Sequence, residues 1–161
     1  MIVIDTLRAQ TLGFRKAIAG MLREDADRAD EIPPNWNNNL RWHAGHLIVT
    51  PRLLTFGLAG EPLGVPEDYR KWFAKGSGPR GWGNDPVPPF VELVDALVAS
   101  IETIFQSMNG RMERPFPQPY TTSLGIVLST PAESLNFSLA HDAMHLGMVM
   151  ALRRELRASA S

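Results

Sequence analysis

The chain has 161 residues, 44% hydrophobic and 20% charged, which is typical of one globular domain spanning 1–161. Its formal net charge is -1, so it lacks the basic excess that binding to nucleic acid or an anionic membrane requires. It contains no cysteine, which excludes disulfides, thiolate metal sites and cysteine nucleophiles.

The N-terminal segment does not have the pattern of a secretory signal. Asp5 and Arg8 interrupt its apolar residues, where a signal peptide has a basic start followed by a long apolar run. No stretch of the chain reaches the length of a transmembrane helix. We therefore expect a cytoplasmic protein that uses neither a membrane nor nucleic acid as a partner.

The first half of the chain predicts two helices. One covers about 3–24, where apolar side chains recur at the three-or-four spacing of a helix face. The members of this face are Leu7, Thr11, Phe14, Ile18 and Met21. The other covers about 37–59 and begins with three asparagines, any of which can cap it. Pro51 lies inside this second pattern and is expected to kink or break it.

The second half predicts two more helices, at about 89–109 and 131–157. The first has the cleanest amphipathic stripe in the chain. The second begins at a capping box, with Thr130 as N-cap and Glu133 completing the box. Four long helices with long connections predict an all-α protein, a four-helix bundle. The alternative is the same bundle with small β elements over one end.

Two long connections join these helices. Residues 60–88 are rich in glycine and proline and contain aromatic residues, which either pin this loop to the bundle or line the mouth of a pocket. Within this loop, 66–74 is expected to form a short helix. In the other connection, 120–122 and 126–128 are expected to be extended.

All four histidines lie in two short segments, 42–46 and 141–145. His141 and His145 are four residues apart on a predicted helix, so they project from one face and can hold a metal ion together. His46 or His43 on a facing helix can supply a third ligand. The alternatives are hydrogen-bonded core histidines or a solvated pair. The apolar surroundings of His141 and His145 favour the metal site, because buried polar groups need partners.

Imidazole ligands suit several divalent metals. Zinc and nickel are favoured, with iron, manganese and copper as alternatives. Asp142 is either an acceptor that orients a ligand or a surface acid. His43 is either a proton shuttle beside the metal or a packing residue. The segment 141–145 is only weakly similar to the zinc protease motif, since it has Asp for Glu and no histidine follows it, and we reject that interpretation.

The two histidine segments resemble those of one family. Residues 38–47 and 141–147, with the helix start at 130–133, are similar to the DinB-like (DinB/YfiT) superfamily of bacterial metal-binding four-helix bundles. The resemblance covers nearly the whole chain. It implies one metal ligand on the second helix and two on the last, here His46, His141 and His145, with water or a ligand at the remaining positions. Pro51 departs from the family pattern.

The resemblance also implies a function and an assembly. Relatives include enzymes that transfer or isomerise with small-molecule thiols, as well as hydrolases, and many are homodimers. We therefore expect a metal-dependent thiol S-transferase or a hydrolase, with His43 or Asp142 moving protons. The substrate would be a small molecule, such as a low-molecular-weight thiol. The alternatives are a metal-binding stress-response protein without catalysis and a plain helical interaction domain.

Overall fold

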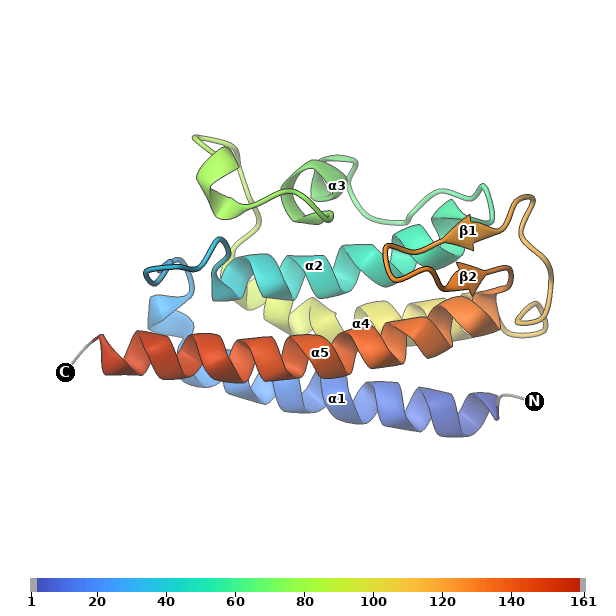
Figure 1. The fold of residues 1–161 in the computed structure, drawn as a ribbon, viewed down its shortest axis with the longest axis horizontal. Helices are drawn as coiled ribbons and strands as arrows, with labels where there is room; N and C mark the ends of the chain where they lie inside the picture. The colour runs from blue at the N-terminus through green and yellow to red at the C-terminus, as the bar shows by residue number, and fades with distance from the viewer. Residues whose placement is uncertain (1–2, 160–161) are drawn as a thin grey trace.

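A computed structural model describes residues 3–159. Four long helices lie side by side as a bundle (Figure 1). Helices α1 and α2 each pack against both α4 and α5. The bounds of the four helices are α1 Ile4–Glu24, α2 Leu40–Arg52, α4 Phe90–Ser107 and α5 Pro131–Ala158. The predicted four-helix bundle is therefore confirmed.

The connections contain several short elements. Helix α3 (Asp68–Phe73) lies in the long loop before α4, and strands β1 (Tyr120–Thr121) and β2 (Val127–Leu128) form an antiparallel hairpin. The hairpin lies beside the N-terminal end of α5 (Figure 1). Short 3-10 turns occupy Ala26–Arg28 and Pro79–Gly81. The short helix and the extended pieces expected from the sequence are thus present.

Local hydrogen bonds define where two of the helices begin. Asn39 Oδ1 accepts the backbone N–H of Trp42 at 2.8 Å, so the third of the three asparagines is the cap of α2. Thr130 Oγ1 accepts the N–H of Glu133, whose carboxylate accepts the N–H of Ser129. The bonds from Trp42 and Glu133 satisfy backbone donors that the first turn of a helix leaves free. The Glu133 carboxylate binds the N–H of the residue before the N-cap.

Pro51 changes the type of helix. It has no N–H to donate to the preceding turn, and α2 ends one residue later, at Arg52. The chain then continues as a π-helical turn, Leu53–Gly57, in which the N–H of Leu58 donates to the carbonyl of Leu53. The prediction of one α-helix over 37–59 is therefore too long, and 40–52 is its α-helical part.

The aromatic residues of the long loop are packed against the bundle. Phe73 is completely buried, and Trp72 is 5% exposed. Tyr69 and Trp82 pack against the same core while remaining partly exposed. This loop is thus held in place next to α2. Among residues 3–159, no helix combines the length and the apolar character that crossing a membrane requires.

Candidate metal centre

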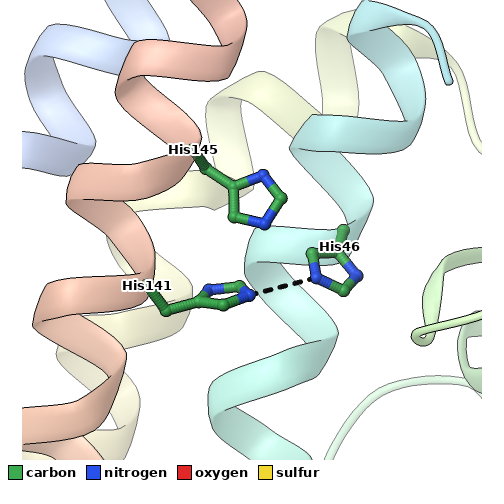
Figure 2. A group of neighbouring side chains, drawn as sticks. All are labelled: His46, His141 and His145. Atoms are coloured by element: carbon green, nitrogen blue, oxygen red, sulfur yellow. Dashed lines mark hydrogen bonds between the residues drawn. The ribbon is translucent and has the colours of Figure 1, made fainter. Parts of the chain in front are cut away.

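Three of the four histidines converge between α2 and α5. His46 comes from α2, and His141 and His145 come from successive turns of α5. Their rings point toward one another (Figure 2), and one nitrogen from each lies within 4.8 Å of the others. The prediction that His141 and His145 lie side by side on one helix face is confirmed. His46 is the histidine of α2 that faces this pair.

The distances fit a shared metal ion. His46 Nε2 and His141 Nε2 are 3.2 Å apart. Two nitrogens bound to one tetrahedral zinc at about 2.0–2.1 Å lie about 3.4 Å from each other. The His141 and His145 ring centroids are 4.4 Å apart, so the third ring reaches the same point. The donor set, three imidazoles and no thiolate, suits zinc, nickel or another divalent transition metal.

His46 is held in place by the loop that precedes α4. Its Nδ1–H donates to the backbone carbonyl of Phe73 at 2.7 Å. The Trp42 ring stacks on the imidazole, with centroids 4.3 Å apart. Protonation at Nδ1 leaves the lone pair of Nε2 free toward the other histidines. Sequence reasoning missed the Phe73 carbonyl, because a backbone acceptor has no residue-type signal.

Gly45 allows this loop to approach α2. A Cβ atom at Gly45 would overlap the side-chain ring of Phe73. Any larger residue at this position therefore displaces Phe73, whose carbonyl holds His46.

We expect Gly45→Ala to lower the free energy of unfolding by about 1–3 kcal/mol through overpacking, and to weaken metal binding. Chemical denaturation and metal titration measure the two effects. The control is Gly13→Ala on the exposed side of α1, where a Cβ meets nothing within 4 Å. That change should be neutral or stabilising by up to about 1 kcal/mol. Equal stability of both variants would contradict the proposed role of Gly45.

His43 is close to the three-histidine cluster but is not part of it. It is completely buried, and its Nδ1 lies 2.9 Å from Nδ1 of His145. Of the two candidate third ligands, the structure brings His46 and not His43 into the cluster. A role for His43 in moving protons stays a prediction.

Asp142 is an interior residue. It is 0% exposed, and both of its carboxylate oxygens accept hydrogen bonds from the equally buried Arg15, at 2.6 and 2.9 Å. The interpretation of Asp142 as a surface acid is therefore wrong. No hydrogen bond among the described residues joins this carboxylate to an imidazole, and a catalytic role for it stays a prediction.

The sequence analysis did not identify Arg15 as a residue of this region. It lies on the buried face of α1 with Thr11 and Ile18, whereas Phe14 is only partly buried. Its position, four residues after Thr11 and three before Ile18, was the available signal. Sequence reasoning missed it, since arginine is rarely buried without a partner and the partner lies 127 residues further along the chain.

Burial keeps all four imidazoles neutral. It lowers the pKa of His43 and of His46 to about 4 and that of His141 to about 3, and it also lowers the pKa of His145. The positive charge of Arg15 acts in the same direction on the three converging histidines. Neutral imidazole is the form that binds metals, so protons compete weakly for these ligands near pH 7.

The lowered pKa values predict how the metal-free protein responds to acid. Between about pH 4 and pH 6.5 the unfolded chain protonates His43 and His46 while the folded chain does not. Stability is therefore lost as pH falls through this window, by up to about 1.4 kcal/mol for each pH unit and each such histidine. Thermal unfolding with a chelator present measures the slope. His46→Gln should reduce it, and an unchanged slope would contradict burial of a neutral His46.

One hollow on the surface is separate from this centre. A cavity of about 370 Å³ lies beside Trp72 and Trp82, and its lining includes no histidine. These aromatic residues therefore both pin the loop and border a cavity, but the cavity does not open onto the cluster.

Comparison with known families agrees with this architecture. A family model of the DinB superfamily matches residues 6–149, which include α2 and all four histidines. Comparison with curated proteins finds no match. The matched region covers most of the chain and contains α2 and the part of α5 that carries His141 and His145, so this protein belongs to the DinB superfamily.

Proposed function

We propose that this protein is a metal-dependent enzyme that transfers or hydrolyses small molecules, with a divalent ion bound by His46, His141 and His145. The observation that supports the proposal most directly is the convergence of three neutral imidazole nitrogens between two helices. Zinc and nickel are the metals we favour for this set.

The number of ligands favours catalysis over a structural role. Structural zinc sites are closed by four protein ligands, whereas catalytic sites have three and leave a position for water or substrate. Within residues 3–159, the cluster contains three residues that can bind one ion. The nearest acid in sequence, Asp142, has both carboxylate oxygens bonded to Arg15 and is not one of the three.

The surroundings of the cluster suit a small ligand. A divalent ion bound here would supply Lewis acidity, lowering the pKa of a thiol or water in the open position. Thr50 places its hydroxyl 3.2 Å from His46 Nε2, where it can hydrogen-bond to such a ligand. His141, Thr50 and Phe137 are each partly exposed. We expect a substrate to approach the cluster from this side of α2 and α5.

The substrates we propose are a low-molecular-weight thiol with an electrophilic acceptor, or an ester or amide cleaved by water. Transfer needs a thiol that loses its proton to a base. The role of His43 in moving protons stays a prediction from the sequence. A homodimer and a cytoplasmic location stay predictions from the sequence.

The first test is metal content. Untagged wild-type protein is purified beside a His46→Ala/His145→Ala double variant, and both are examined by elemental analysis and by zinc and nickel titration. We expect close to one ion per wild-type chain and none in the variant. The metal-loaded and metal-free proteins are then assayed with panels of thiols, thiol acceptors and esters.

The outcomes separate three functions. Metal-dependent turnover supports the enzyme. Stoichiometric metal without turnover over the whole panel favours a metal-binding protein that is not a catalyst. If the wild type neither carries metal nor takes up zinc or nickel, the histidines are structural and the proposal fails.

A further inference from the structure

His43 occupies an unusual position for a polar side chain. It is completely buried on α2, one turn before His46. Its Nδ1 pairs with Nδ1 of His145 at 2.9 Å. Its other ring nitrogen, Nε2, is also buried and has no hydrogen-bond partner among the described residues. An apolar residue would fill this place without leaving a polar atom unpaired. The feature that only a polar residue can provide here is the contact of Nδ1 with His145.

The contact bears on which nitrogen of His145 can bind a metal. Figure 2 shows one nitrogen of His145 facing His46 and His141. Since Nδ1 is the atom directed to His43, the nitrogen that faces the other two ligands is Nε2. A neutral histidine that binds metal through Nε2 carries its proton on Nδ1 and needs an acceptor for it.

His43 Nδ1 is placed to be that acceptor. With the proton on His145 Nδ1, the hydrogen bond runs from His145 to His43, and His43 carries its own proton on Nε2. The reverse arrangement, in which His43 donates, puts a proton on Nε2 of His145. That proton would occupy the side of the ring that faces His46 and His141 and would block coordination.

We propose that His43 is a positioning residue for the metal centre: it accepts the Nδ1–H of His145 and so presents Nε2 of His145 to the ion. The inference rests on the proposed function, because it requires that His145 is a ligand. In this arrangement His46, His141 and His145 bind the ion, and His43 lies behind His145 and supports it.

Three substitutions of His43 separate positioning from packing. His43→Asn keeps an acceptor where Nδ1 stands, because the amide oxygen of asparagine overlays that atom. His43→Gln retains an amide but places its oxygen one methylene further out, and His43→Leu fills the space without an acceptor. Each variant is checked by circular dichroism and thermal unfolding, and zinc affinity is measured by competition with a chelator.

We expect zinc affinity close to that of the wild type for His43→Asn and about 10–100-fold weaker for His43→Leu and His43→Gln, the usual effect of losing a partner of a metal ligand. If the leucine variant does not fold, the asparagine and glutamine variants still make the comparison. A purely packing role predicts instead that leucine is tolerated and that asparagine gives no rescue.

Nuclear magnetic resonance of the wild type provides an independent readout. Long-range nitrogen–proton spectra of the ¹⁵N-labelled, zinc-loaded protein identify the protonated nitrogen of each ring. We expect His145 to be protonated on Nδ1 and bound through Nε2. Protonation on Nε2, or undiminished zinc affinity in both the leucine and the glutamine variant, would overturn the role of His43 and leave the three-histidine site standing. A wild type that binds no zinc would overturn the proposed function itself.

Discussion

Replacing Arg15 by leucine is expected to lower the free energy of unfolding by about 3–5 kcal/mol, because it leaves a buried carboxylate without its partner. Arg15 and Asp142 are both 0% exposed. Arg15 also reaches the carbonyl of Leu97 on α4, at 3.4 Å. One guanidinium thus links α1, α4 and α5 at the level of His141 and His145.

The stability lost in Arg15→Leu should increase with pH. Burial raises the pKa of the Asp142 carboxyl, and Arg15 opposes that rise. Without Arg15 the pKa rises further, and the folded variant holds a proton that the unfolded chain releases. A group whose folded pKa is raised contributes stability that is lost as pH rises. The difference between wild type and Arg15→Leu should therefore be larger at pH 8 than at pH 5.5.

Urea denaturation at the two pH values measures both effects. The matched control is the double variant Arg15→Leu/Asp142→Leu, which removes both charges and restores an apolar interior. A buried ion pair replaced in this way is often neutral or stabilising, so the double variant should regain most of the lost stability. A double variant as unstable as Arg15→Leu alone would show that the cost comes from packing and not from the unpaired charge.

His141→Ala is expected to remove most of the metal affinity while leaving the fold nearly unchanged. The fall should exceed about 100-fold, since the loss of a hydrogen-bonding partner of a ligand alone costs about 10–100-fold. His141 Nε2 is 3.2 Å from His46 Nε2, so the two rings form one side of the cluster. His141 is also partly exposed and its Nδ1 has no partner among residues 3–159, so few contacts are lost with it.

Zinc titration and thermal unfolding of the metal-free variant check the two halves of this prediction. Met144→Ala is a suitable control, because Met144 lies between His141 and His145 in sequence but is 51% exposed. It should bind zinc as the wild type does. Stoichiometric, tight metal binding by His141→Ala would remove His141 from the ligand set.

The helices and the His141–His145 pair of the candidate site follow from local patterns in the sequence. Apolar spacing located α1, α4 and α5 to within about two residues at each end but overran the end of α2. Short-range hydrogen bonds at Asn39 and Thr130 explain why the starts of α2 and α5 could be predicted. His141 and His145 share a helix face because of helical periodicity alone. A pattern contained within one helix depends only on neighbours in sequence, which is why the chain shows it directly.

Contacts between distant segments decided the rest. His46 and His43 are three residues apart, so both lie near the face of α2 that packs against α5. How α2 is rotated against α5 decides that His46 joins the cluster. Phe73 supports His46 only because Gly45 lets the loop approach. Asp142 is buried because Arg15 meets it from another helix. Packing among all the helices sets the rotation of α2, the approach of the loop to α2 and the pairing of Arg15 with Asp142. The spacing of residues within one segment does not predict these three features.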